Sequence, residues 1–185
     1  MKKAALMILA LVLCMNMSGC LGAVQADDYI YVVGIGFDKG SQYRFNVTFL
    51  VQKDVSGSEQ TSTGGAEIIS AEGDTLFDAI TVLSAGVPFR INFSRVNTFF
   101  FGEEVARSGS IKELSNITFN ALKIRQSAKL MVCLGTAQRL MQGLCLEDVP
   151  NITKLQFSVF QDYAAEGITV ITNYAGMLES IRGRR

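Results

Sequence analysis

The sequence predicts an α/β (α+β) fold: a mixed β-sheet flanked by helices, with an N-terminal β-hairpin and a short, mostly helical C-terminal tail. Residues 43–52 alternate between apolar and polar side chains, which is typical of a strand. Residues 67–104 then give a strand pattern, a capped helix and a second strand pattern. A hydrophobic content of 49% with 18% charged residues indicates a globular chain, and 185 residues are enough for one domain, or for one domain and part of a second.

The first two strand patterns predict a β-hairpin. Residues 29–37 are apolar and rich in β-formers, and residues 38–41, Asp-Lys-Gly-Ser, have turn chemistry. In the alternating stretch that follows, we expect one buried face, made of Tyr43, Phe45, Val47, Phe49 and Val51. The other face is polar and holds Arg44, Asn46, Thr48 and Gln52, with Leu50 as the exception.

Two glycines in the first strand, Gly34 and Gly36, resemble the start of a dinucleotide-binding loop. The third glycine position of that loop is occupied by Lys39, and a turn into another strand follows instead of a helix. The two glycines therefore predict close backbone packing or a bulge.

A polar loop over residues 54–65 leads to a strand pattern at residues 66–71 and then to a helix. Thr75 and Asp78 have capping-box spacing, and Gly86 and Pro88 end the helix. The predicted inner face of this helix consists of Leu76, Ala79, Ile80, Leu83 and Val87.

Residues 95–101 end in three phenylalanines, which predict a central strand covered on both faces. A capped helix begins at Ser110, and its inward residues are Ile111, Leu114, Ile117, Ala121 and Leu122. A strand is expected at residues 128–134 and a short helix at 136–142, closed by Gly143. Residues 144–151 are a predicted linker, and residues 152–181 are predicted to be mostly helical with a break at Gly167.

No residue type in the chain points to catalysis. The sequence contains no histidine, which removes Ser-His-Asp and Cys-His mechanisms and His-ligated metals. The adjacent acidic pairs Asp27-Asp28 and Glu103-Glu104 lack further oxygen ligands at loop spacing, so we interpret them as solvated charges. We predict no catalytic, cofactor-binding or metal-binding residue, and the balanced net charge predicts no binding of nucleic acid.

The N-terminus has the pattern of a bacterial lipoprotein signal. Lys2 and Lys3 precede an apolar run that is too short to span a bilayer, and Ser18-Gly19 stand directly before Cys20. We predict that residues 1–19 are removed, that Cys20 is diacylated, and that residues 20–28 link the anchor to the domain. A signal-peptidase site at residues 24–26, before Asp27, is the alternative.

Two cysteines, Cys133 and Cys145, lie within the predicted domain. They can form a disulfide in an oxidising compartment. The buried strand pattern around Cys133 favours its use as a small hydrophobic residue.

Several ordered segments resemble the N-terminal domain of the Ger(x)C spore germination lipoproteins. The resemblance covers about residues 18–145 and lies in Ser18-Gly19-Cys20, Val33–Lys39, Ser70–Ala79, Asn92–Val96 and Phe101–Gly109. The family usually has Trp-Asp and Arg-Glu pairs after the lipid cysteine, where this chain has Leu21-Gly22-Ala23. Residues 29–145 are then the Ger(x)C-like domain, and residues 146–185 are a linker and the truncated start of a second domain.

The resemblance implies a non-catalytic lipoprotein subunit of a germinant receptor, on the outer face of the spore inner membrane. Its implied partners are the two integral-membrane receptor subunits, of the A and B types, and its implied role is in nutrient-triggered germination. A solute-binding lipoprotein that itself binds a small nutrient is the alternative. A hydrolase is the least favoured function, since no activated nucleophile can be named without histidine.

Overall fold

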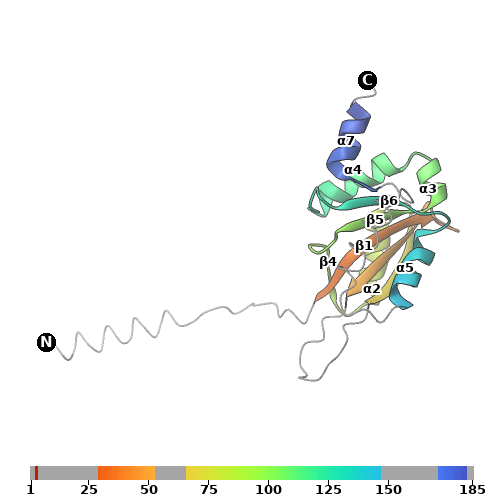
Figure 1. Ribbon diagram of the computed structural model, residues 1–185. Coiled ribbons are helices and arrows are strands. Elements are labelled where there is room, and N and C mark those ends of the chain that lie inside the picture. The colour runs from red at the N-terminus through yellow and green to blue at the C-terminus, as the bar shows by residue number, and fades with distance from the viewer. Residues whose placement is uncertain (1–2, 4–28, 53–65, 147–170, 183–185) are drawn as a thin grey trace.

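The computed structural model describes residue 3 and residues 29–52, 66–146 and 171–182, and every structural statement below refers to these residues. They form a seven-stranded mixed sheet with helices packed on it, so the predicted α/β class is confirmed (Figure 1). The strand order is β3-β2-β1-β5-β6-β7, and β4 pairs with β1 outside this path. The strands are β1 (Tyr29–Lys39), β2 (Phe45–Gln52), β3 (Ala66–Gly73), β4 (Arg90–Asn92), β5 (Thr98–Phe101), β6 (Lys129–Val132) and β7 (Ile171–Asn173).

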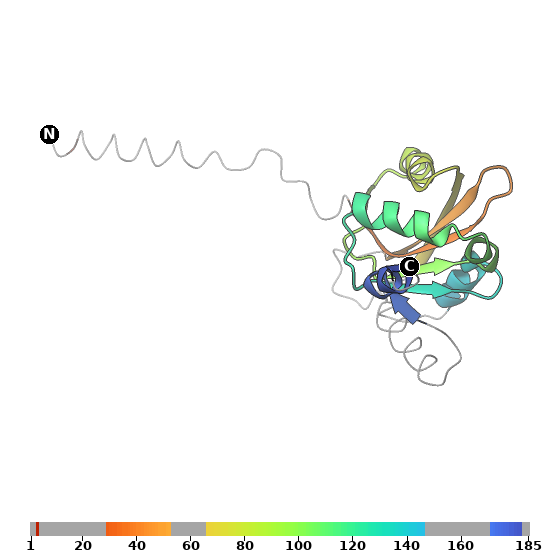
Figure 2. The same cartoon turned by 90° about the horizontal axis from the view of Figure 1, so that it is seen from above.

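The helices divide between the two faces of the sheet. They are α2 (Leu76–Gly86), α3 (Glu103–Arg107), α4 (Ile111–Ala121), α5 (Ala137–Leu146) and α7 (Tyr174–Arg182). Buried side chains of α2, α3, α4 and α7 belong to one hydrophobic cluster, whereas those of α5 belong to a second. Figure 2 shows α2 and α4 on one side of the sheet and α5 on the other. The sheet is therefore buried on both faces.

The predicted hairpin is confirmed, since β1 and β2 pair in antiparallel fashion. The prediction of a polar outer face on β2 was wrong, because Thr48 and Leu50 are fully buried on the side that α5 covers. Tyr43 is 52% exposed and lies in the turn before β2, so it is not part of the buried face.

The two glycines of β1 serve the packing roles that the sequence predicts. A register shift between Val32 and Gly34 marks a bulge in the pairing with β2. Gly36 lies against α5, where a Cβ atom would stand 2.7 Å from Sδ of Met141 and 3.2 Å from Cβ of Ala137. Helix α5 can approach β1 this closely because Gly36 has no side chain.

The three phenylalanines of β5 form the centre of the domain, as predicted. Strand β5 lies between β1 and β6, parallel to both. Phe99 and Phe101 belong to the first cluster and Phe100 to the second, so the strand is buried on both faces. The ring of Phe101 stacks on that of Phe37, with 5.4 Å between the ring centroids.

The start of α2 has the predicted capping box. The Thr75 hydroxyl oxygen accepts a hydrogen bond from the Asp78 N–H at 3.2 Å, and the Asp78 carboxylate accepts one from the Thr75 N–H at 2.9 Å. Helix α2 ends at Gly86, as the sequence indicates. In α4, Leu114 is buried as predicted, but Ala121 is exposed and the prediction for it was wrong.

Several boundaries differ from those predicted. Strand β5 begins at Thr98, and the separate short strand β4 before it was not predicted. Helix α5 continues through Gly143 to Leu146. Residues 171–173 form β7, antiparallel to β6, where a helix was expected, whereas α7 is helical as expected.

The predicted loop over residues 54–65 and most of the linker and tail before residue 171 lie outside the described residues. The division of the chain into two domains stays a prediction.

Replacing Gly36 by alanine should destabilise the domain by about 1–3 kcal/mol, because the fully buried Met141 has little room to yield to the new methyl group. The urea midpoint of unfolding measures the change. Gly143→Ala is the matched control on α5, since a Cβ atom there meets nothing within 4 Å. The control should raise stability by about 0.5–1 kcal/mol. Equal midpoints for the two variants would contradict the packing argument.

Candidate functional site

A crevice lies where the three central parallel strands end. Phe37, Phe101 and Val132 stand side by side in the register, so the loops after β1, β5 and β6 meet at one edge of the sheet. The chain after β5 enters α3 and α4 on one face, and the chain after β6 enters α5 on the other. Ligands of open α/β sheets commonly bind where the chain diverges in this way, so this crevice is the first candidate for a ligand-binding site.

The crevice has a volume of about 250 Å³ and is lined mainly by polar and charged residues. These residues are Asp38, Lys39, Gly102, Glu103, Glu104, Val105, Arg107, Gly135 and Thr136. On its rim, Lys39 Nζ lies 3.3 Å from a Glu104 oxygen, and Arg107 lies 2.7 Å from a Glu103 oxygen. The rim charges are thus paired with one another.

One charged residue of the crevice, Asp38, is buried, with only 5% of its surface exposed. Its two carboxylate oxygens accept hydrogen bonds from the N–H groups of Ala137 at 2.7 Å and Gln138 at 2.8 Å. Thr136 Oγ1 accepts a further bond from the Arg139 N–H at 3.3 Å. The first turn of α5, which would otherwise attract an anion, is therefore satisfied by side chains of the chain itself.

Burial raises the pKa of Asp38 above its ordinary value, and this effect outweighs the two backbone N–H groups, which lower the pKa. The sequence suggested Asp38 as a turn residue. Instead it ends a buried strand and caps a helix 99 residues away.

Gly102 provides the space that the Asp38 carboxylate occupies. A Cβ atom at position 102 would overlap Oδ1 of Asp38. The Gly102 N–H donates to the Phe37 carbonyl at 2.9 Å, and the Glu103 N–H donates to the Gly135 carbonyl at 2.9 Å. Backbone bonds thus hold the ends of all three strands together around Asp38.

Both cysteines of the domain are free thiols, and Cys133 is buried in line with its strand pattern. Burial, together with the negative charge of Asp38, raises the pKa of the Cys133 thiol to about 12. Burial also raises the pKa of Cys145. Neither thiol has the depressed pKa that activates a nucleophile.

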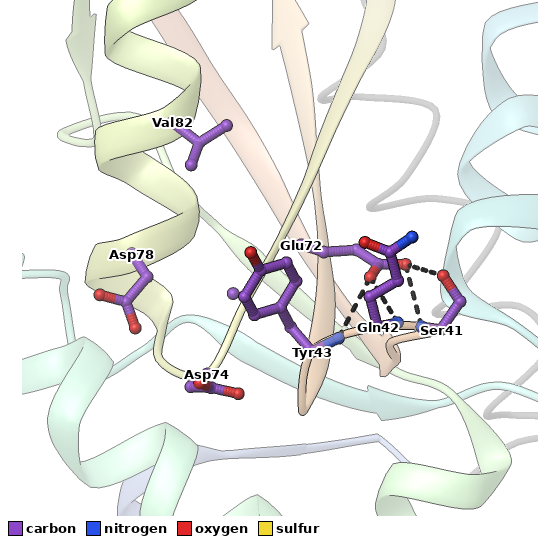
Figure 3. A pocket seen from close by; sticks show the side chains of 8 residues that line it. Ser41, Gln42, Tyr43, Glu72, Asp74, Asp78 and Val82 are labelled. Atoms are coloured by element: carbon purple, nitrogen blue, oxygen red, sulfur yellow. Dashed lines mark hydrogen bonds between the residues drawn. The ribbon is translucent and has the colours of Figure 1, made fainter.

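A second, open hollow of about 780 Å³ lies between the β1–β2 turn and α2 (Figure 3). One of its lining residues is Glu72, whose carboxylate accepts hydrogen bonds from the N–H groups of Ser41, Gln42 and Tyr43 and from the Ser41 hydroxyl. These bonds lower the pKa of Glu72 to about 2. The carboxylate occupies the anion-binding nest of the turn, so that nest does not face the hollow.

Two more acidic residues hold the same turn. Asp74 accepts a hydrogen bond from the Arg44 N–H at 3.1 Å. The Arg44 guanidinium binds both oxygens of Glu113 on α4, at 3.2 and 2.9 Å. Of the three carboxylates around the hollow, those of Glu72 and Asp74 fix the hairpin turn, and that of Asp78 caps α2.

The arrangement supports structural roles for these groups rather than chemistry. Within the described ranges, no three His, Cys, Asp or Glu side chains gather closely enough to hold a metal ion. In the same ranges, none of the helices has the length and apolar character needed to cross a bilayer. Cys20, the predicted lipidation site, lies outside the described residues, so its modification stays a prediction.

Comparison of the sequence with known proteins identifies the family of the chain. Residues 22–176 match the sequence model of a family described as "Spore germination protein N-terminal domain". The chain belongs to this family. The Ger(x)C resemblance of the sequence is thereby confirmed, and the matched spore germination domain extends into α7.

One relative of the domain is the "Putative spore germination protein YfkR" of Bacillus subtilis (strain 168). The two are 28% identical over 152 residues, which are 77% of this chain and 39% of the relative. The aligned part thus spans well under half the length of that relative. No solved structure matches the chain significantly.

Asp38→Asn should cost the domain about 1–3 kcal/mol, because one N–H of α5 loses its acceptor and faces an amide N–H₂ instead. Chemical denaturation measures the loss. Glu104→Gln is the control at the crevice rim: its side chain is 71% exposed, and its replacement should change stability by less than about 0.5 kcal/mol. A loss for Asp38→Asn as small as that of the control would show that the cap does not stabilise the fold.

The Glu72 carboxylate should make the domain sensitive to acid. Its pKa in the folded state, about 2, lies below the ordinary glutamate value of 4.5, so its contribution to stability is fully present above pH 4.5 and is lost as the pH falls toward 2. Glu72→Gln removes this contribution. The difference in unfolding midpoint between wild type and variant should therefore shrink between pH 5 and pH 2. A difference that is constant across this range would rule out the proposed carboxylate bonds.

Proposed function

We propose that this spore germination protein is a lipid-anchored, non-catalytic subunit of a germinant receptor. In this proposal, the diacylated Cys20 holds the domain at the outer face of the spore inner membrane. The domain docks on the integral-membrane receptor subunits of the A and B types, and the complex triggers germination in response to a nutrient. Family membership supports the role in germination, and the anchor and the docking are the added steps.

The observation that carries the proposal is the position of Cys20 relative to the domain. The family match begins at residue 22, directly after the Ser18-Gly19-Cys20 motif. A lipid attached at Cys20 would therefore stand two residues before the start of the family match and nine before β1. Two acyl chains suffice for stable membrane attachment, whereas one would give only reversible binding.

The state of the polar groups supports a role without catalysis. Both oxygens of Asp38 accept bonds from α5, and Glu72 is engaged by the β1–β2 turn. The raised pKa of Cys133 keeps its thiol protonated. The alternative of a solute-binding lipoprotein gains no support from the hollow beside Glu72, because the Glu72 carboxylate that lines it accepts hydrogen bonds from the β1–β2 turn.

Mass spectrometry of the chain from the membrane fraction tests the anchor. The mature chain should begin at Cys20 and carry a diacylglyceryl group on its thiol. Cys20→Ala should abolish the modification and the cleavage before residue 20, so that the variant no longer has the mass of the processed lipoprotein.

Cys14→Ser provides the matched control, because Cys14 lies in the apolar run of the predicted signal and should leave the modification unchanged. An unmodified mature chain that begins at Asp27 would overturn the anchor.

A further inference from the structure

Acidic and basic residues are arranged differently at the two ends of the sheet. The end where β1 terminates holds Asp38, Glu72, Asp74, Glu103, Glu104 and Glu113 around the crevice and the hairpin turn. Of the basic residues at that end, Lys39, Arg44 and Arg107 form ion pairs with these acids. Lys112 and Arg139 lie at the same end, in the first turns of α4 and α5. The opposite end, where β1 begins, is formed by the loops that enter β4, β5 and β6.

These loops carry basic residues and no acidic ones. The sequence has no Asp or Glu between Asp78 and Glu103, or between Glu113 and Glu147. The two loops lie together, because the Lys129 N–H donates to the Asn97 carbonyl at 2.8 Å and the Arg125 guanidinium lies 3.5 Å from the Ser94 carbonyl oxygen. We name this face the amino-end surface; its basic residues are Arg90, Arg95, Lys123, Arg125 and Lys129.

The acidic residues near this end stand outside these loops. Glu67 stands at the start of β3, at the outer edge of the sheet and two strands from β1. Asp27 and Asp28 precede β1 in the sequence. In the sequence, Lys53 and Asp54 follow β2, and Glu147 and Asp148 follow α5. The excess of positive charge therefore belongs to the loops that enter β4, β5 and β6, which carry five basic residues and no acidic one.

Aromatic side chains lie among these cations. Phe89 is 47% exposed and directly precedes Arg90 at the start of β4. The Arg95 guanidinium lies 3.8 Å from the centre of the Tyr31 ring, and the Tyr29 ring is 6.4 Å from that of Tyr31. Basic residues with exposed aromatic rings are typical of a surface that meets lipid headgroups.

The position of the proposed anchor points to the same end. Tyr29, the first residue of β1, follows Cys20 by nine positions, which a chain spans over at most about 30 Å. Figure 1 shows β4 beside the start of β1, so Phe89 and Arg90 lie close to where the chain from Cys20 joins the domain.

We propose that the amino-end surface lies on the anionic surface of the membrane that carries the lipid anchor. This inference rests on the proposed lipidation of Cys20. The anionic headgroups attract the basic loops, Phe89 enters the headgroup region, and the acidic end with Glu72 and Glu103 faces away from the bilayer. The lipid anchor tethers the domain, and the amino-end surface sets its orientation.

The chain contains no tryptophan, so a single introduced tryptophan reports on its own position. Phe89→Trp and Phe77→Trp are matched reporters, since the two phenylalanines are 47% and 44% exposed at opposite ends of α2. Each lipidated variant is reconstituted into vesicles of phosphatidylcholine alone or with phosphatidylglycerol, and quenching by brominated lipid is measured. We expect strong quenching at position 89 only with phosphatidylglycerol, and little at position 77 in either vesicle.

Neutralising charges tests the electrostatic part. The double replacement Arg90→Gln with Arg125→Gln is made in the Phe89→Trp background. It should lower the ratio of molecules whose amino-end surface contacts the bilayer to molecules whose surface does not, by about fivefold for each arginine replaced. Lys112→Gln with Arg139→Gln, two exposed basic residues outside the amino-end surface, should leave it unchanged. Raising the salt from 0.1 M to 1 M should weaken the contact, because the Debye length falls from about 10 Å to about 3 Å.

Mass spectrometry of the same samples separates the two proposals. A diacylated Cys20 with equal quenching at positions 77 and 89, or with quenching that does not depend on phosphatidylglycerol, overturns the amino-end surface and leaves the anchor standing. If position 89 shows no quenching in bare vesicles, but its tryptophan fluorescence changes when an integral-membrane subunit is added, the face belongs to a protein partner and the inference is overturned. An unmodified Cys20 overturns the anchor and with it the inference.

Discussion

The bond between Asp38 and the start of α5 joins the two layers of this domain. Asp38 ends the central strand β1, and its carboxylate holds the first turn of the only described helix that covers the second face of the sheet. With α5 fixed there, Phe100, Leu50 and Met131 become a buried cluster instead of an exposed sheet face. This arrangement requires glycine at positions 36 and 102. Gly36 leaves room for α5, and Gly102 leaves room for the Asp38 carboxylate.

This bond determines geometry more than it adds stability. Removing a carboxylate from water is unfavourable, as the raised pKa of Asp38 shows, and its two backbone bonds offset only part of that cost. An apolar residue at position 38 would avoid the cost but would leave the N–H groups of α5 without these acceptors. The carboxylate therefore selects one position for α5, in the way that buried polar groups specify a unique arrangement in some other proteins.

The elements with strong local patterns were predictable from the sequence. The alternation in β2, the capping box of α2 and the phenylalanines of β5 each depend on neighbouring residues alone. Strands β4 and β7 have three residues each, and they are strands because they pair with β1 and β6. These pairings are between residues far apart in the sequence, so no local pattern predicts them. Asp38 was missed for a related reason: its partners are 99 and 100 residues away, and a polar residue before Lys-Gly-Ser has the local signature of a turn. Two signals pointed to it, an aspartate directly after a buried apolar strand and a glycine at the matching end of β5.

The two ends of the sheet differ in how their charges are used. At the carboxyl end, acids and bases bind one another and the backbone, so this end is tied internally by Asp38, Glu72 and Glu113. At the amino end, the unpredicted strand β4 brings Arg90 beside Tyr29, at the point where the chain from Cys20 enters the sheet. A tether alone leaves a domain free to rotate, whereas a basic and aromatic face next to the tether gives one orientation on an anionic surface. The short strand that local sequence could not reveal is thus the element that connects the fold to the proposed membrane contact.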